Sequence, residues 1–298
     1  MTRPTVLMTG LLCFAACMKG GVSGDHVEDA GARAEHDVGS GDAGLDAGSD
    51  AGAPDAGVLE TFASPGCDGG VTLIEGPGSI QINDAGRSYI VRLPTGYSRA
   101  RVYPLVLALH PNGSNSSYWD KTSGTEDIRD EVKADAILVV PQARTGDWRT
   151  EVAVDELYFD ALLKRVKNNL CVDTRRIFSM GFSGGGSYSG VLGCTRTDIR
   201  AIAVGGAVIY FDPTACVGTP AAWVTIGDDE LIPARAEYRD FWRTRNQCTA
   251  ETSPVDPDPC FAYACPLAER PVYYCRHVGG HEWPTFGSHA AWAFFQKF

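Results

Sequence analysis

The order of apolar and polar residues predicts alternating strands and helices in the chain after residue 58. Residues 104–109 and 136–140 are continuous apolar runs, which is typical of strands buried on both faces of a parallel sheet. Residues 155–170 instead repeat apolar side chains at spacings of three and four, which predicts a helix. A turn at 83–86 separates two shorter strands and predicts that the sheet begins with an antiparallel hairpin.

The whole pattern predicts an α/β fold with a mostly parallel, doubly wound sheet flanked by helices. Strands are expected at residues 71–75, 79–83, 88–93, 104–109, 136–140, 176–182, 201–205, 222–226 and 272–277. Helices are expected at residues 155–170, from 184 onward, at 234–245 and at 288–297. Ligands of such sheets bind at the carboxyl ends of the strands, so we expect the functional residues in the loops there.

The first 58 residues have a different composition from the rest of the chain. Residues 1–16 carry Arg3 and then a short apolar run, which predicts an export signal. Small residues precede Cys17, as in a bacterial lipoprotein signal, so we expect Cys17 to carry lipid; a plain secretory signal cleaved nearby is the alternative. Residues 17–58 repeat Asp-Ala-Gly and predict a disordered tether to a folded domain at 59–298.

The net charge of the chain does not change the predicted fold class. The formal net charge is −11, but residues 18–58 hold nine acidic residues against Lys19 and Arg33. The remaining domain is only mildly acidic and has no basic stripe, which argues against a nucleic-acid partner. With 298 residues, 44% of them hydrophobic, the chain is long enough to bury one substantial core.

The cysteine content supports export. Without Cys13 in the signal and Cys17 at the lipid site, an even set remains: Cys67, Cys171, Cys194, Cys216, Cys248, Cys260, Cys265 and Cys275. An even set in an exported chain predicts disulfides, with the connectivity left open. No Cys-x-x-Cys pair is present, so we expect no zinc site. The protein is expected at the cell surface or outer membrane as a lipoprotein, or secreted, with no membrane contact except a lipid anchor.

The strongest chemical motif is Gly181-Phe182-Ser183-Gly184-Gly185. It follows a predicted strand and opens a predicted helix, where a Gly-x-Ser-x-Gly run presents a nucleophilic serine on a sharp turn. Small residues are needed two positions before and after that serine. The helix N-terminus behind Ser183 brings backbone N–H groups that can stabilise an oxyanion.

A serine nucleophile needs a base, and the base needs an orienting carboxylate. Of the six histidines, His281 lies in a Gly-Gly-His loop after the last predicted strand, which suits a base held by a fixed loop. Asp228, Asp229 and Glu230 follow the preceding strand, and the local sequence does not choose between them. The order serine, acid, histidine is that of α/β-hydrolases.

The oxyanion hole requires a second backbone donor beside Gly184. His110, Pro111 and Asn112 follow the first core strand, where α/β-hydrolases place that donor. Proline has no N–H, so Asn112 is the better candidate.

With these residues assembled, residues 70–298 resemble the esterase family that includes polyhydroxybutyrate depolymerases, feruloyl esterases and acetylxylan esterases. The matching segments are 87–94, 104–110, 172–177, 181–186, Asp229 with Pro233, Gly-Gly-His-x-Trp-Pro at 279–284, and 291–295. In that family the acid stands four residues before a proline, which selects Asp229. The family usually has His-Gly after its first core strand, whereas this chain has His110-Pro111. Cys194, Cys216, Cys248 and Cys265 also look like positions that the family uses.

The resemblance implies a serine esterase that forms an acyl-enzyme with no metal or organic cofactor. The expected substrates are feruloyl or acetyl esters on plant cell-wall polysaccharide, with poly(3-hydroxybutyrate) as the alternative and a non-catalytic surface binding protein as a hypothesis of another class. Trp119, Trp148 and Trp283 are candidates for an aromatic acyl pocket, although packing is an equal alternative. We expect a monomer.

Overall fold

The computed structural model describes residues 62–69, 73, 75–83, 85–150 and 152–298. The predicted signal at 1–16, the tether at 17–58 and the lipid site Cys17 lie outside these residues, as does most of the strand predicted at 71–75. Of that segment, residues 73 and 75 are described, and neither lies in a strand.

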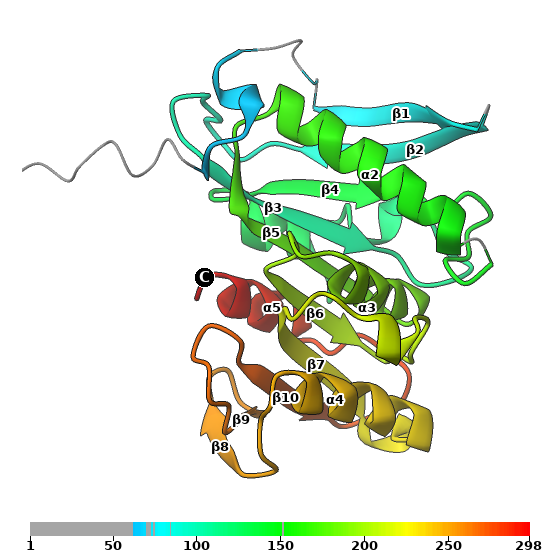
Figure 1. The fold of residues 1–298 in the computed structure, drawn as a ribbon, viewed down its shortest axis with the longest axis vertical. Helices are drawn as coiled ribbons and strands as arrows, with labels where there is room; N and C mark the ends of the chain where they lie inside the picture. The colour runs from blue at the N-terminus through cyan, green and yellow to red at the C-terminus, as the bar shows by residue number, and fades with distance from the viewer. Residues whose placement is uncertain (1–61, 70–72, 74, 84, 151) are drawn as a thin grey trace, which may run out of the picture. The chain divides into compact units, whose positions relative to one another are not determined.

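A single mixed sheet organises the described residues (Figure 1). Its ten strands are β1 (Gly76–Ile82), β2 (Ala85–Arg92), β3 (Tyr103–Leu109), β4 (Ile137–Pro141), β5 (Val172–Phe182), β6 (Ala201–Gly205), β7 (Ala221–Gly227), β8 (Thr252–Val255), β9 (Cys260–Tyr263) and β10 (Val272–His277). They lie in the order β1-β2-β4-β3-β5-β6-β7-β10-β9-β8. The six strands from β4 to β10 in that order are parallel, and the two strands at each end are antiparallel. The predicted α/β fold is therefore confirmed.

Helices cover both faces of the sheet. They are α1 (Ile128–Val132), α2 (Val152–Asn169), α3 (Gly184–Thr195), α4 (Pro233–Arg245) and α5 (Gly287–Phe295). Helices α2, α3 and α4 pack into one apolar layer, through residues such as Phe159, Tyr188 and Trp242, and lie on one side of the sheet in Figure 1. Helices α1 and α5 form the opposite layer, through Ile128 and Phe295. The central strands β3, β4, β6 and β7 are buried at every position because both faces are covered.

The predicted elements from residue 79 onward all appear, within a few residues at their ends. One short α-helix and two short strands were not predicted, namely α1, β8 and β9. Strand β8 is Thr-Ser-Pro-Val and mostly exposed, so it lacks the apolar alternation that marks a strand. It lies at the edge of the sheet, where a proline is tolerated.

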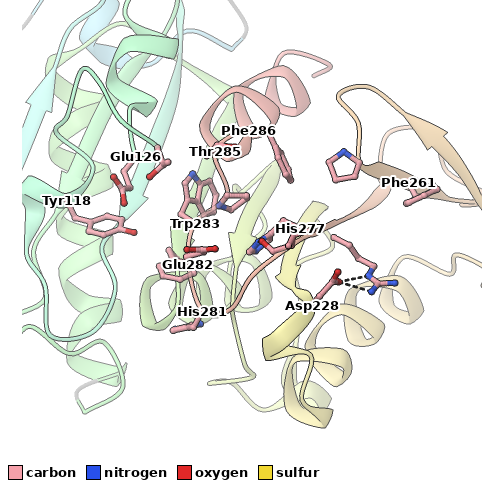
Figure 2. Close-up of a pocket in the computed structure, with 16 residues that line it drawn as sticks. Tyr118, Glu126, Asp228, Phe261, His277, His281, Glu282, Trp283, Thr285 and Phe286 are labelled. Atoms are coloured by element: carbon pink, nitrogen blue, oxygen red, sulfur yellow. Dashed lines mark hydrogen bonds and ion pairs between the residues drawn. The ribbon is translucent and has the colours of Figure 1, made fainter.

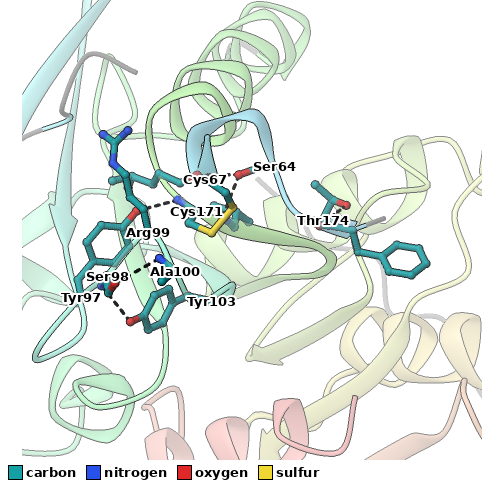
Figure 3. Close-up of a disulfide and its surroundings, with 12 residues drawn as sticks. Ser64, Cys67, Tyr97, Ser98, Arg99, Ala100, Tyr103, Cys171 and Thr174 are labelled. Carbon is teal, nitrogen blue, oxygen red and sulfur yellow. Dashed lines mark hydrogen bonds between the residues drawn. A yellow bond between two sulfur atoms is a disulfide. The ribbon is translucent and has the colours of Figure 1, made fainter. Parts of the chain in front are cut away.

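All eight cysteines predicted to form disulfides are paired. The bonds are Cys67–Cys171, Cys194–Cys216, Cys248–Cys265 and Cys260–Cys275. The first joins the N-terminal segment to the residue before β5 across 104 positions (Figure 3). Two hydrogen bonds of the buried Ser64 hydroxyl reinforce this connection, one to the Leu170 carbonyl at 2.6 Å and one from the Val172 amide at 2.9 Å.

We predict that the Cys67–Cys171 disulfide stabilises the fold more than the Cys248–Cys265 disulfide, because it closes the longer loop. The loops span 104 and 17 residues, for which chain entropy gives about 4.7 and about 3 kcal/mol respectively. Urea unfolding of the two double Cys→Ser variants measures the difference. Equal losses, or a larger loss for Cys248 and Cys265, would contradict the prediction.

Candidate active site

Ser183 is the single residue between β5 and α3, in the sharp turn that the sequence predicts. Its φ angle is +56°, in a region that a non-glycine residue occupies at a cost of about 1–3 kcal/mol. A Cβ on Gly181 would lie 2.5 Å from the Gly185 backbone, and one on Gly185 would lie 2.1 Å from the Leu109 carbonyl oxygen. Only glycine permits this approach of the turn to β3, which explains the spacing of the motif.

The structure brings His281 to Ser183. The His281 Nε2 atom lies 2.8 Å from Ser183 Oγ, and the ring packs against Phe182 with centroids 4.7 Å apart. The loop after β10 carries His281, and Gly279 turns that loop with a φ of +112°. The Ser183 amide donates to the Gly205 carbonyl at 2.8 Å, which ties the turn to β6. The hydroxyl is therefore within hydrogen-bond reach of a base.

The carboxylate at His281 belongs to Glu230. Residues Asp228–Glu230 form a 3₁₀ turn directly after β7, and Glu230 is its last residue. Its Oε2 atom contacts His281 Nδ1, while Oε1 accepts from the Gly227 amide at 3.3 Å. The Glu230 side chain is 5% exposed, whereas the His281 side chain is 40% exposed, so a buried carboxylate holds a ring that is open to solvent on its other side.

This contact corrects the expectation for Asp229, which the family resemblance selected. Asp229 is exposed, and its backbone amide donates to the Gly279 carbonyl at 3.0 Å. Asp228 pairs with Arg276 at 2.7 Å, as Figure 2 shows. Successive side chains of a 3₁₀ turn are about 120° apart, so only one of the three acids can face His281.

Arg235, in the first turns of α4, holds Glu230 in place. Its Nη2 lies 3.1 Å from Glu230 Oε2, its Nη1 donates to the Glu230 carbonyl at 3.2 Å, and its Nε donates to the Gly206 carbonyl at 3.1 Å. Nη2 is also 2.9 Å from His281 Nδ1. A guanidinium can only donate, and the ring donates to Glu230 through the same nitrogen, so this last contact is a close approach of a positive charge. No motif in the sequence marked Arg235.

Asn112 lies against the start of α3. A Cβ on Gly184 would stand 1.9 Å from Asn112 Oδ1, so the carboxamide occupies the space that a side chain would need. The Trp148 amide donates to this oxygen at 3.1 Å, and Asn112 Nδ2 donates to the Tyr210 hydroxyl at 3.4 Å. The first amides of a helix have no partner within it. The two residues expected to form an oxyanion hole are therefore neighbours.

His110 braces the loop that carries Asn112. The ring is fully buried, its Nδ1 donates to the Pro111 carbonyl at 2.8 Å, and its Nε2 accepts from the Ala143 amide at 3.2 Å. This hydrogen-bond pattern requires the neutral ring. Burial lowers the pKa of His110, with the Pro111 carbonyl acting in the opposite direction. His110 therefore has a structural role: it supports the loop in which this chain has Pro111 where the family usually has glycine.

Two of the three tryptophans are too deeply buried to contact an acyl group. Trp119 and Trp148 are fully buried, and their indole N–H groups donate to the carbonyls of Leu109 and His110 at 2.7 and 2.8 Å. They fix the carboxyl end of β3, so the packing alternative holds for both. Trp283 is 4% exposed and packs edge-to-face on Trp119, although it also borders a groove.

Two hollows border residues of this site, one at His281 and one at Tyr210, which contacts Asn112. The larger is a groove of about 940 Å³ that begins at Phe182 and His281 and follows the loop to Phe286 (Figure 2). The smaller has about 260 Å³ and is lined by Arg149, Val152, Val208, Ile209 and Tyr210. Sequence reasoning identified neither, because their walls come from loops that are distant in sequence.

Across the described part of the chain, no group of three or more His, Cys, Asp or Glu side chains is placed to hold a metal ion. In the same residues, none of the helices has the length and apolar character needed to cross a membrane.

The chain is similar to curated fungal esterases over most of its length. It is 30% identical to feruloyl esterase D of Neurospora crassa, over 79% of this chain and 90% of that protein. It is 29% identical to the probable feruloyl esterase C of Aspergillus flavus, over 78% of this chain and 90% of that protein. Among solved structures, the CE1 ferulic acid esterase of Anaeromyces mucronatus in complex with ferulic acid has a TM-score of 0.53 at 16% identity, with 75% and 91% of the two chains covered. No family model matches the chain.

We predict that the neutral form of His110 makes the fold sensitive to mild acid. Because its pKa is lowered in the folded protein, the unfolded chain binds more protons as pH falls below about 6.5, and stability falls with it. Urea unfolding of the wild type and of His110→Gln at several pH values from 7.5 to 5 isolates this effect. The stability advantage of the wild type should shrink as pH falls, and a constant advantage would contradict the role given to His110.

Proposed function

The chain belongs to the feruloyl esterases, a family of carboxylic ester hydrolases, and we propose that it cleaves feruloyl or acetyl esters on plant cell-wall polysaccharide through Ser183, His281 and Glu230. The observation that carries the proposal is one continuous set of contacts. Ser183 Oγ lies 2.8 Å from His281 Nε2, and the Nδ1 of the same ring meets the buried Glu230 carboxylate.

These contacts suit the transfer of one proton, from Ser183 to His281, while Glu230 stays ionised. His281 Nε2 takes the Ser183 proton as the oxygen attacks the ester carbonyl carbon, and Glu230 accepts the Nδ1–H bond and stabilises the imidazolium that forms. His281 then gives the proton to the leaving alcohol, which leaves an acyl-enzyme on Ser183. A water molecule, deprotonated by the same ring, releases the acid and restores the serine.

The negative charge of each tetrahedral intermediate falls on the former carbonyl oxygen. Backbone amides of Gly184 and Asn112 are the proposed donors to that oxygen, supported by the close packing of Asn112 on Gly184. One donor of this kind is worth about 10²–10³ in rate. Pro111 stands where the family usually has glycine and has no N–H, so the Asn112 amide is the proposed second donor.

The substrate class rests on the relatives. Those described above bear the name feruloyl esterase, and they give no support to the polyester depolymerase considered from the sequence. Four disulfides are typical of proteins that fold in an oxidising compartment, so we also propose that the protein is exported. The lipid at Cys17 and the monomeric state stay predictions.

Substitution of the nucleophile and of the carboxylate tests the triad. With methyl ferulate as substrate, Ser183→Ala should lose kcat by about 10⁴-fold or more, and Glu230→Gln should lose about 10²–10⁴-fold because the ring is no longer held in the required tautomer. Asp229→Asn is the matched control and should stay within a few-fold of the wild type. A large loss in Asp229→Asn with an active Glu230→Gln would return the role to Asp229. An active Ser183→Ala would overturn the proposed mechanism.

Arg235 acts through Glu230 and is a positioning residue. Arg235→Gln removes a positive charge next to His281 Nδ1 and two hydrogen bonds to Glu230. We expect kcat to fall by about tenfold, the cost of a displaced charged contact. KM should stay within a few-fold of the wild-type value, because Arg235 lines neither of the two hollows.

Arg239→Gln is the control for Arg235. This arginine lies one turn further along α4 and pairs with Asp240 at 3.0 Å. It should change neither kcat nor KM. If urea unfolding shows that the lost activity of Arg235→Gln is matched by a loss of folded protein, the arginine supports the fold alone.

A further inference from the structure

The two hollows border different members of the proposed reaction centre. The groove of about 940 Å³ borders His281, whose Nε2 faces Ser183. The hollow of about 260 Å³ includes Tyr210, whose hydroxyl contacts Asn112 on the side of the proposed oxyanion donors. A substrate that spans the centre therefore meets a large groove at the base and a small hollow near the oxyanion donors.

The direction of proton transfer assigns the groove. In acyl transfer, the oxygen of the leaving alcohol must approach the N–H that His281 presents, while the carbonyl oxygen faces the amide donors. The alcohol part of the ester thus extends from the His281 side, into the groove. The smaller hollow is left for the acyl part.

The walls of the groove suit a sugar chain. Flat apolar surfaces are provided by Tyr118, Phe261 and Phe286, and polar groups alternate with them along the groove (Figure 2). Phe261 is 38% exposed, so its ring is open to a ligand. A sugar ring offers C–H faces and hydroxyls together, and a volume of about 940 Å³ is at the upper end of small-molecule sites. A methyl group would leave most of this space unused.

The charges of the groove discriminate among sugar chains. Its walls hold the carboxylates of Glu126, Asp228 and Glu282. Arg276 is the cation among the described lining residues, and Asp228 engages it at 2.7 Å. The nearby Lys121 is engaged by Glu126 at 3.0 Å.

Two other titratable groups border the groove. Burial raises the pKa of the Tyr118 hydroxyl, with Glu126 adding to the effect, so this phenol adds no charge. His277, also in the wall, is buried and donates through Nδ1 to the Val278 carbonyl at 3.2 Å. The net charge of the groove wall is negative, and it repels an anionic sugar chain.

We propose that this groove binds the alcohol part of the ester as a neutral oligosaccharide and disfavours chains that carry uronic acids. The proposal rests on the esterase function proposed above and specifies its substrate. Phe261 supplies binding surface, and Glu282, which is exposed beside His281, supplies repulsion of anions.

The test compares three feruloyl esters on the full-length protein. They are methyl ferulate, the feruloyl ester of a neutral trisaccharide, and the same trisaccharide ester with one uronate in place of a neutral sugar. We expect kcat/KM for the neutral trisaccharide ester to exceed that for methyl ferulate by about tenfold, since one well-buried aromatic contact supplies that much. The uronate ester should be weaker than the neutral ester by up to about fivefold, the usual size of an exposed charge effect, and the gap should close with added salt.

Two variants link these ratios to the groove. Phe261→Ala should remove most of the preference for the neutral trisaccharide over methyl ferulate, and Glu282→Gln should narrow the gap between the neutral and uronate esters. Leu157→Ala, an exposed apolar residue on α2 outside both hollows, is the matched control and should keep both ratios.

The outcomes separate this inference from the proposed function. If methyl ferulate is cleaved in a Ser183-dependent way but the trisaccharide ester is no better, or Phe261→Ala leaves the ratio unchanged, the groove assignment is overturned and the esterase function stands. An equal or higher rate on the uronate ester overturns the charge selection. If no ester is cleaved, the proposed function fails and the groove assignment fails with it.

Discussion

The close approach of three backbone segments at Ser183 is the constraint on which the site depends. The carboxyl end of β3, the turn after β5 and the first turn of α3 meet at distances that exclude any Cβ on Gly181 or Gly185. The left-handed φ of Ser183 persists because both flanking elements are fixed, one within the sheet and one against it. Two buried tryptophans hold the end of β3 through its carbonyls, so this strained turn rests on a rigid support.

The same edge of the sheet delivers the other groups. Asn112 follows β3, Glu230 follows β7 and His281 follows β10, so each side chain arrives from the carboxyl end of a parallel strand. Each loop is then fixed by an independent contact. His110 braces the first, the Gly227 amide holds the second through Glu230, and the Gly279 carbonyl accepts from the Asp229 amide and joins the second to the third. Rigid loops of this kind keep the three groups within reaction distance.

The sequence predicts the parts of this arrangement that local pattern determines. Buried strands are continuous apolar runs, and the turn at Ser183 needs glycine at defined positions, so both can be read from neighbouring residues. The choice among Asp228, Asp229 and Glu230 cannot be predicted from neighbouring residues, because it depends on the rotation of one 3₁₀ turn. That rotation is set by partners distant in sequence, the Gly279 carbonyl and Arg276. The same limit applies to the tryptophans. The sequence does not distinguish a tryptophan that lines a pocket from one that supports a strand.

Glu230 in place of an aspartate has a consequence for the charge around the base. The longer side chain reaches His281 from the end of the turn, and it is buried, so its charge must be compensated. Arg235 provides this compensation with contacts to both the carboxylate and the carbonyl of Glu230. The same guanidinium lies 2.9 Å from His281 Nδ1 and donates to the Gly206 carbonyl at 3.1 Å, so it also ties the turn after β7 to the end of β6. The ion pair between Arg235 and Glu230 therefore fixes the carboxylate that holds the imidazole, and the orientation of His281 depends on a residue of α4 that contacts neither Ser183 nor the hollows.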